Sequence, residues 1–283
     1  MSGLLPWRMV AYDPTIYLGT AAHYVRGRPP YSDSLPAVLA AELGLDGSGR
    51  LLDVGCGPGV LTVQLADCFE EAIGIDPDPD MLAAGARRAA EAGLDHVRWI
   101  RALAEDIPSL DLGTFRLVTF GQSFHWTDRE RVAETVYEIL EPGGTLALVV
   151  HDVEDRPVPA GPGYPPIPHE AIRALVTAYL GPRRRAGQGF SRTHPDRYED
   201  ALGRTRFGRP YSIYAPGRPD IVQDADHVLS NYLSTSFAAP HLFGDRLEAF
   251  ERDVRAELAT RSESGLFWDW PGDTKIDIAR RPA

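Results

Sequence analysis

LLDVGCGPG, at residues 51–59, joins an apolar run to a loop with glycines spaced G-x-G-x-G. The dinucleotide fingerprint G-x-G-x-x-G needs its third glycine one place later, where this chain has Val60. Pro58 removes a backbone N–H that a pyrophosphate would use, and Asp53 puts negative charge where a phosphate would be repelled. The stretch therefore predicts a strand-to-helix turn for a ligand that carries positive charge rather than phosphate.

Short apolar runs alternate with amphipathic stretches on both sides of this loop, which is the pattern of a parallel sheet with crossover helices. The strands are predicted at 51–55, 71–76, 97–102, Phe115–Gly121 and Thr145–Val150. The helices are predicted at Ser34–Leu43, where the helix packs on the sheet edge, and at 60–69, 80–92 and Arg129–Leu140, the last followed by a turn at Pro142-Gly143-Gly144.

The chain changes character after residue 150. Six prolines between 157 and 168 predict a loop, because proline fixes φ and cannot donate to a strand ladder. Helices are predicted at 168–181, 220–234 and 240–260, and strands at 209–215 and 274–280. We interpret these strands as the last two of the same sheet, and the helices as a cover over its carboxyl edge. The predicted division is 1–45, an amino-terminal helical segment; 46–154, the cofactor-binding core; and 155–283, the last strands with the covering insert.

Composition excludes several classes of protein. A net charge of -11 over 283 residues disfavours nucleic acid as a partner, since that binding depends on clustered Lys and Arg. The apolar runs are strand-sized, far short of the roughly 18 residues of a membrane span. The first residues carry no basic leader followed by an apolar region, which predicts a cytoplasmic protein. Cys56 and Cys68 lack the spacing of a zinc site or a disulfide framework, so we expect reduced thiols and no metal.

Asp76 ends the second predicted strand, 17 residues beyond Gly59. A carboxylate there can accept hydrogen bonds from both hydroxyls of a ribose. The alternative is a turn or helix-capping residue before Pro77. Asp78 and Asp80 are better explained as turn and capping residues than as metal ligands.

Four segments, in order, resemble the motifs of class I S-adenosylmethionine-dependent methyltransferases: LLDVGCGPG at 51–59, IGIDPDPDML at 73–82, ALAEDIP at 102–108 and LEPGGTLALV at 140–149. The resemblance covers about residues 20–150. A subgroup has Y-x-x-x-RPPY before the sheet, here Tyr24 to Tyr31, and a His-Trp pair after strand four, here in GQSFHW at 121–126. The resemblance implies an α/β fold: a Rossmann-like, seven-stranded, mostly parallel sheet of order 3-2-1-4-5-7-6 with a helical cap insert. It also implies S-adenosyl-L-methionine as cofactor and S-adenosyl-L-homocysteine as product.

The resemblance also implies roles for individual residues. The methionine part would be contacted by Asp53, Gly55, Gly57 and Gly59, the ribose by Asp76, and the adenine by Pro77 and Met81 on one side and Leu103, Ala104 and Glu105 on the other. The family often has an acidic residue where Leu103 stands, which leaves backbone groups to recognise the adenine edge here. Gln122 and Ser123, after the fourth strand, complete the predicted cofactor set.

Arg28 is our candidate for the methionine carboxylate, with Tyr24 nearby; the alternative for both is ordinary packing of the amino-terminal segment. His125 is the candidate general base, because it follows strand four at the carboxyl edge and an imidazole pKa of about 6.5 suits neutral pH. The alternative for His125 is a loop histidine that touches the cofactor. His151 and His23 are weaker candidates for the base.

These features predict transfer of a methyl group to an O, N or C nucleophile of a small molecule in secondary metabolism, by a monomer or homodimer. The Asn-Pro-Pro-Tyr turn of amide-methylating enzymes is absent, and Ser123 lacks the G-x-S-x-G context of a hydrolase nucleophile. Arg183, Arg184 and Arg185 form a basic run that either meets an acidic acceptor or lies in a solvated loop. Aromatic residues that line an acceptor pocket or fill a core follow residue 155: Tyr164, Phe190, Tyr198, Tyr211, Tyr214, Tyr232, Phe237 and Phe243. Two other classes stay open: a cofactor-binding scaffold or cyclase that transfers no methyl group, and a nicotinamide dehydrogenase, which the glycine spacing disfavours.

Overall fold

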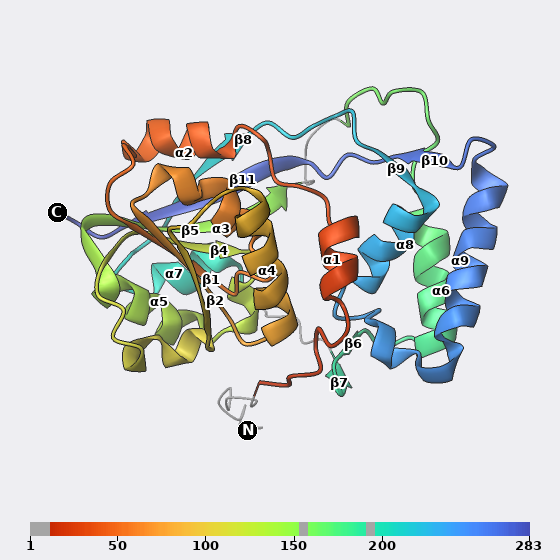
Figure 1. The fold of residues 1–283 in the computed structure, drawn as a ribbon, viewed down its shortest axis with the longest axis horizontal. Coiled ribbons are helices and arrows are strands. Elements are labelled where there is room, and N and C mark those ends of the chain that lie inside the picture. Colours follow the sequence, from red (N-terminus) through yellow and green to blue (C-terminus); the bar gives the residue numbers. More distant parts are fainter. Residues whose placement is uncertain (1–11, 153–157, 191–195) are drawn as a thin grey trace, which may run out of the picture.

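The computed structural model describes residues 12–152, 158–190 and 196–283. Figure 1 shows a twisted sheet with flanking helices on one side of the molecule and a smaller group of helices on the other. Helix α1 (Ala21–Gly27) stands between the two and contacts both α4 and α8. The two parts are thus joined through a short amino-terminal helix as well as through the chain that runs between them.

The main sheet has seven strands in the order β3-β2-β1-β4-β5-β11-β8. Their bounds are β1 Arg50–Val54, β2 Glu71–Asp76, β3 Val97–Arg101, β4 Phe115–Gly121, β5 Leu140–Asp152, β8 Tyr211–Ala215 and β11 Asp273–Arg280. The first five are parallel, and β11 runs antiparallel to both of its neighbours. Counted in chain order, the seven strands have the order 3-2-1-4-5-7-6, so the predicted sheet and its order are confirmed.

Helices cover both faces of the sheet because successive residues of a buried strand point to opposite sides. In β1, Leu51 packs in a cluster with Leu35 of one helix, while the adjacent Leu52 packs in the opposite cluster with Val132 of another. The helices of this part are α2 Leu35–Leu43, α3 Val60–Leu65, α4 Pro79–Glu91, α5 Arg129–Ile139 and α7 Tyr198–Gly203. Helix α2 also contacts the edge strand β8, as the predicted packing on the sheet edge requires.

The second part, which we call the helical cap, has its own hydrophobic core. It contains α6 His169–Leu180, α8 Ala225–Leu233 and α9 Leu247–Arg261, together with the antiparallel pair β9 Val222–Asp224 and β10 Leu266–Trp268. Val228, Phe250 and Phe267 are fully buried in this core. A small hairpin of β6 (Arg185–Ala186) and β7 (Gly189–Phe190) follows α6.

Two cap helices begin later than predicted. The helix expected over 220–234 starts at Ala225, because Val222–Asp224 pair with β10 and the Asp224 side chain accepts a hydrogen bond from the His227 N–H as the helix cap. The helix expected over 240–260 starts at Leu247, since 3-10 turns occupy 240–242 and 244–246.

The predicted turn at Pro142-Gly143-Gly144 lies inside β5. Leu140 pairs with Phe115 and Thr145 with Leu117, so residues 141–144 form an irregularity in which Gly143 has a φ of 80°. The division at 45/46 and 154/155 stays a prediction. The second of these boundaries lies outside the described residues, and so does Pro157. The same is true of most of the amino-terminal stretch on which the expectation of no leader rests.

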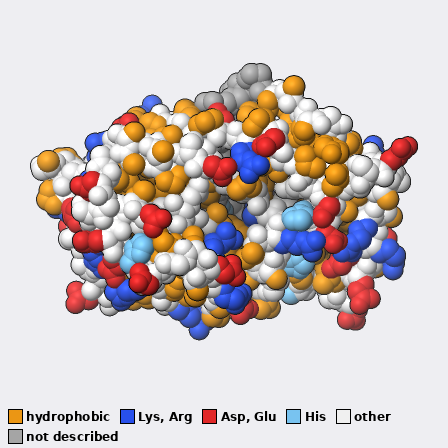
Figure 2. Space-filling model, turned by 45° about the horizontal axis from the view of Figure 1, so that its top comes forward, with side chains coloured by type: hydrophobic (Ala, Val, Ile, Leu, Met, Phe, Trp, Pro, Cys, Tyr) orange, Lys and Arg blue, Asp and Glu red, His pale blue; other side chains and the backbone are white. Residues whose placement is uncertain are grey.

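Figure 2 shows acidic and basic side chains interspersed with hydrophobic ones over one face of the molecule. Among the residues described, no helix combines the length and the apolar character needed to cross a bilayer. Cys56 is buried and Cys68 is partly buried, and neither forms a disulfide with a described residue.

Candidate functional site

The glycine loop is bound to the end of the neighbouring strand. After β1 ends at Val54, the Cys56 N–H donates to the Ile75 carbonyl at 3.0 Å and the Gly57 N–H donates to Asp76 Oδ2 at 2.9 Å. A Cβ placed on Gly57 would meet no atom within 4 Å. The carboxyl ends of β1 and β2 therefore form one unit, in which backbone rather than side chains borders the edge of the sheet.

Asp76 lies at the centre of this unit. Its carboxylate is 9% exposed, and its other oxygen accepts the Asp78 N–H at 2.9 Å. Burial raises the pKa of Asp76 to about 6, and the nearby carboxylates of Asp78 and Asp53 act in the same direction. Asp78 in turn accepts the N–H groups of Asp80 and Met81 at the start of α4, which confirms its interpretation as a capping residue.

Asp53 lies beneath the loop and is 1% exposed. Its two oxygens accept hydrogen bonds from the hydroxyls of Thr62 in α3, at 2.6 Å, and Thr119 in β4, at 2.9 Å. Burial raises its pKa to about 6. Its contact with a methionine group stays a prediction, and the structure adds that this carboxylate links β1, α3 and β4 below the loop.

The indole of Trp99, on β3, leaves no room for a side chain at three neighbouring glycines. A Cβ on Gly59, Gly74 or Gly85 would come within 2.3–2.7 Å of the Trp99 ring. Gly59 therefore permits close packing of loop, strand and helix, whatever it contacts in a ligand. The sequence carries no signal for this arrangement, since the four residues come from four different elements.

The residues predicted to contact the adenine follow two adjacent strands. Pro77 and Met81 follow β2, and the segment 103–105 follows β3. The Pro77 carbonyl accepts from Arg101 Nε at 3.1 Å, and Met81 is 3% exposed at the start of α4. Leu103 precedes the 3-10 turn Ala104–Ser109. Glu105 accepts the Asp128 N–H at 3.0 Å, which links this turn to the start of α5.

Ser123 supports the glycine loop from below. Its hydroxyl donates to the Val54 carbonyl at 2.5 Å, and a Cβ on Gly55 would lie 2.6 Å from the Ser123 Cβ. Gln122 has a φ of 54°, a left-handed conformation that is uncommon outside glycine and marks the chain reversal after β4.

His125 lies in the 3-10 turn Phe124–Trp126 that follows β4, at the predicted edge of the sheet. Its Nδ1 is 3.2 Å from the Tyr198 hydroxyl, and its ring lies tilted at 4.9 Å from the Trp126 ring. Tyr198 belongs to α7 and was predicted only as one of the aromatic residues that line an acceptor pocket or fill a core, with no link to His125. Only the three-dimensional structure brings it to His125.

Arg28 follows α1 and has an unsatisfied donor. Its guanidinium lies 4.8 Å from the centre of the Tyr24 ring, and Nη2 donates to the Ser234 carbonyl at 3.2 Å. Its Nε is buried and has no hydrogen-bond partner among the described residues. Nearby, Tyr31 stacks on His151 at 5.0 Å, and burial, reinforced by the charge of Arg28, lowers the pKa of His151 to about 4. His151 is therefore a neutral imidazole at pH 7.

The segment 12–20 lies across the same edge, and sequence analysis gave it no role. The Tyr17 hydroxyl accepts from Trp126 Nε1 at 3.2 Å, and burial raises the pKa of Tyr17 to about 12. Burial also raises the pKa of Tyr12, helped by the carboxylates of Asp76 and Asp78. The Asp13 carboxylate accepts the Gln188 N–H of the β6–β7 hairpin at 2.7 Å.

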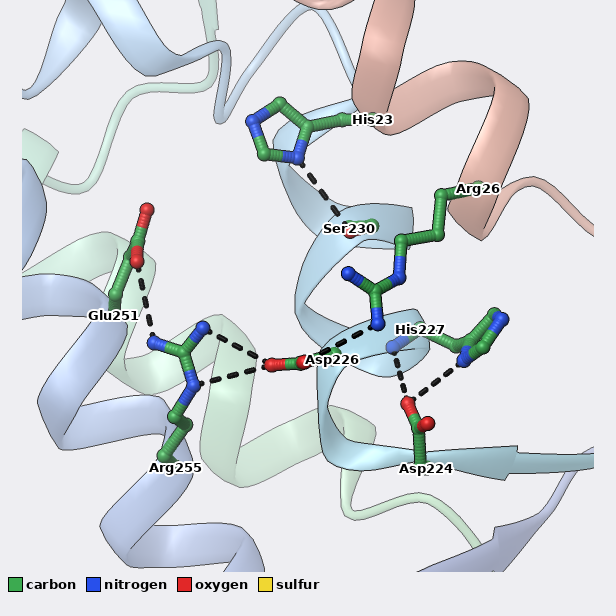
Figure 3. A network of polar contacts seen from close by, with 8 residues as sticks. All are labelled: His23, Arg26, Asp224, Asp226, His227, Ser230, Glu251 and Arg255. Carbon is green, nitrogen blue, oxygen red and sulfur yellow. Dashed lines mark hydrogen bonds and ion pairs between the residues drawn. The ribbon is translucent and has the colours of Figure 1, made fainter.

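His23 has a different place from the other candidates. Figure 3 shows it directed at Ser230 of α8, with Nδ1 3.5 Å from the hydroxyl, in a polar network between α1 and the helical cap. The structure therefore gives His23 a contact in the interface between α1 and α8.

Comparison with known proteins gives one family model, described as a methyltransferase domain, over residues 51–144. A probable S-adenosylmethionine-dependent methyltransferase of Saccharomyces cerevisiae, CRG1, is 36% identical over 130 residues, 45% of this chain and 44% of that protein. A trans-aconitate 2-methyltransferase of Mycobacterium tuberculosis is 30% identical over 169 residues, 58% of this chain and 54% of that protein. The chain thus spans about half the length of the curated relatives it matches.

Among solved structures, the [4+2]-cyclase SpnF superposes with a TM-score of 0.53 at 18% identity, covering 95% of this chain and 94% of that one. This likeness shows a shared fold over nearly the whole chain.

Proposed function

Because residues 51–144 match a methyltransferase-domain model, we propose that the chain is a class I S-adenosylmethionine-dependent methyltransferase. In this proposal it transfers a methyl group to an O, N or C nucleophile of a small molecule. S-adenosylmethionine is the cofactor of this family. It supplies a methyl group already activated by a sulfonium, so the protein has to bind, orient and exclude water rather than activate the carbon.

The observation that carries the proposal is the hydrogen bond between the Gly57 N–H and Asp76. It holds a carboxylate at the end of β2, beside a loop whose backbone is approachable. Each oxygen of Asp76 keeps acceptor capacity beyond the one backbone N–H it binds, so the pair fits two ribose hydroxyls. Negative charge from Asp76 and Asp53 also suits a ligand that carries an ammonium and a sulfonium.

Arg28 supports the assignment of a methionine carboxylate. A buried guanidinium Nε without a partner costs free energy that an anionic ligand would recover. The Tyr24 ring beneath the guanidinium holds its plane in position. Ordinary packing explains the contact with Tyr24 but leaves the Nε–H without an acceptor.

His125 is proposed as the base where the acceptor must lose a proton. The turn after β4 holds it at the carboxyl edge of the sheet, and its contact with the Tyr198 hydroxyl orients the ring. His151, which stacks on Tyr31, is neutral at pH 7 and stays the second candidate.

A small molecule is the acceptor class that charge favours, because the chain carries a net charge of -11 and mixes both signs on the face in Figure 2. The name of the M. tuberculosis relative makes trans-aconitate the first acceptor to assay, alongside a panel of natural-product precursors. A role in secondary metabolism, a cytoplasmic location and a monomeric or homodimeric state remain parts of this proposal.

A second candidate is a cofactor-binding protein that catalyses a cyclisation without methyl transfer. The superposition on the cyclase SpnF over nearly the whole chain favours keeping it, because cofactor motifs report binding while function depends on the acceptor site. Release of S-adenosylhomocysteine with any acceptor would exclude this alternative.

The testing experiment is calorimetric titration of the protein with S-adenosylmethionine, S-adenosylhomocysteine and NADH. We expect micromolar affinity for the first two, weakened by about 100-fold or more in Asp76→Ala, since hydrogen bonds to a charged group contribute about 1.5–3 kcal/mol each. Asp80→Ala, an exposed neighbour two residues after the cap residue Asp78, is the matched control and should bind like the wild type. Binding of NADH alone, or of none of the three, would overturn the proposal.

A further inference from the structure

Two arginines from distant parts of the chain meet at one turn of the helical cap. Arg28 donates to the carbonyl of Ser234, and the Arg184 guanidinium lies 4.3 Å from the centre of the Phe237 ring. Ser234 and Phe237 are three residues apart in the turn that follows α8. Arg28 comes from the end of α1 and Arg184 from the segment between α6 and the β6–β7 hairpin, so the fold brings two positive charges to the same place.

Neither guanidinium has an acidic partner in the part of the chain that the structure describes. Within residues 12–152, 158–190 and 196–283, neither forms an ion pair, and the Nε of Arg28 is buried without any acceptor. Two like charges held together cost free energy unless an anion or solvent compensates them. Desolvation lowers the pKa of Arg184, and the charge of Arg28 acts in the same direction.

The groups around Arg28 are aromatic or neutral. Its charge lowers the pKa values of Tyr17, Tyr31 and His151, which come from three segments of the edge described above. Burial keeps both tyrosines protonated and the imidazole uncharged at pH 7. Three carboxylates also act on the pKa values of these groups: Asp76 acts on Tyr17, Asp53 on Tyr31 and Asp269 on His151.

We propose that Arg28 and Arg184 form a two-guanidinium site for a carboxylate, which lies on the cap side of the sheet edge. Planar guanidiniums match a carboxylate by paired N–H donors, which a lysine in either place would not provide. The inference rests on the proposed function, and the carboxylate has two possible sources: the methionine part of the cofactor or an acidic acceptor. In either case Arg184, within the basic run Arg183–Arg185, would contact a ligand rather than solvent alone.

The test uses Arg28→Gln and Arg184→Gln, with Arg183→Gln as matched control, since the Arg183 guanidinium instead stacks on Phe190 at 3.8 Å. Each protein is titrated with S-adenosylhomocysteine and with 5′-methylthioadenosine, which lacks the methionine carboxylate. Each is then titrated with citrate, a tricarboxylate, in the presence of saturating S-adenosylhomocysteine. Thermal melting checks that every variant is folded.

If the cofactor supplies the carboxylate, both variants bind S-adenosylhomocysteine about tenfold or more weakly than the wild type, and their affinity for 5′-methylthioadenosine is unchanged. If the acceptor supplies the carboxylate, Arg184→Gln binds S-adenosylhomocysteine with unchanged affinity and binds citrate more weakly by a similar factor. The two-guanidinium site would be overturned if Arg184→Gln bound all three probes as Arg183→Gln does, even if Arg28→Gln alone bound S-adenosylhomocysteine more weakly. Failure of the wild type to bind either nucleoside would instead overturn the proposed function.

Discussion

The glycine loop at the carboxyl edge of the sheet excludes side chains, whereas the helical cap is filled by large ones. At Gly55 a single added methyl group would overlap Ser123, and at Gly59 it would overlap Trp99. In the cap, by contrast, Phe243 and Phe250 stack at 4.2 Å in a core of large hydrophobic residues. We therefore expect added atoms to disturb the glycine loop at the sheet edge and removed atoms to disturb the cap. Changes at the sheet edge should lower both cofactor affinity and stability, whereas changes in the cap should lower stability alone.

The largest effect is expected from Phe250→Ala. The ring is fully buried against Phe243 and Tyr179, and removing such a ring lowers the free energy of unfolding by about 3–5 kcal/mol. Denaturant unfolding measures the loss. Phe120→Ala, in β4 and 1% exposed, is the comparison in the sheet.

Cofactor affinity should distinguish the two phenylalanine variants, because only one of them changes the sheet that leads to the glycine loop. Under conditions where both remain folded, S-adenosylhomocysteine should bind Phe250→Ala within about twofold of wild type and bind Phe120→Ala more weakly, because β4 leads directly to Ser123. Equal loss of affinity in both would mean that the cap and the sheet edge form one cooperative unit.

The next effect is expected from Gly55→Ala. Alanine at a φ of 64° costs about 1–2 kcal/mol, and overlap with Ser123 adds about 1–3 kcal/mol. Gly57→Ala is the control, since φ is 53° but the added Cβ meets nothing within 4 Å. Chemical denaturation should therefore show a clear excess loss for Gly55→Ala. Equal losses would attribute the whole effect to backbone conformation.

The sheet could be predicted from sequence because its signals are local. Strand β2 has the apolar run Ala72–Ile75 between polar ends, and the start of α4 is marked by Asp78 and Pro79 within three residues of the strand. The cap strand Val222–Asp224 could not be predicted, because three residues become a strand only through pairing with Leu266–Trp268. Its helix start was therefore placed too early.

The same difference applies to the site. The proximity of Asp76 to the glycine loop could be predicted because its strand end and the loop lie within 21 residues of each other, at 55–76, whereas its contact with a ribose stays a prediction. The contact between Tyr17 and Trp126 joins residues 109 apart, and that between His125 and Tyr198 joins residues 73 apart. No periodicity or spacing in the sequence predicts contacts between residues so far apart. The residues that cover the sheet edge could therefore be identified only from the structure.

A smaller effect is expected from pH acting on Asp76. With a pKa of about 6, the carboxylate is mostly ionised at pH 7 and about one-tenth ionised at pH 5. Only the ionised form accepts hydrogen bonds from both ribose hydroxyls through both oxygens, so affinity for S-adenosylhomocysteine should fall roughly tenfold from pH 7 to pH 5. In Asp76→Asn the affinity should be weaker and should change less over that range, which calorimetry at the two pH values tests.

The free energy of unfolding should change with pH in the opposite direction to the affinity, because it should rise as the pH falls. Because burial raises the pKa of Asp76 and Asp53 above the unfolded value near 3.9, the folded protein binds more protons between about pH 4 and pH 6. These two groups therefore favour the folded state most below pH 4, and their contribution is lost as pH rises through 6. Asp76→Asn should flatten this part of the stability profile of the ligand-free protein, and an unchanged slope would assign it to other carboxyl groups.

The smallest effect is expected from the polar network between α1 and the cap in Figure 3. Arg26 and Asp226 form an ion pair at 3.2 Å with both side chains nearly half exposed, and such pairs contribute about 0.2–1 kcal/mol, less at high salt. One residue further on, a Cβ on Gly27 would lie 2.1 Å from the Asn231 nitrogen, so the close approach of α1 and α8 depends on that glycine. Arg26→Ala should thus lower the unfolding free energy by less than about 1 kcal/mol, and Gly27→Ala by more, in the same denaturation assay. If Arg26→Ala proved the more damaging of the two, α1 would be held to the cap by charge rather than by close packing. Its position between α4 and α8 would then vary with ionic strength.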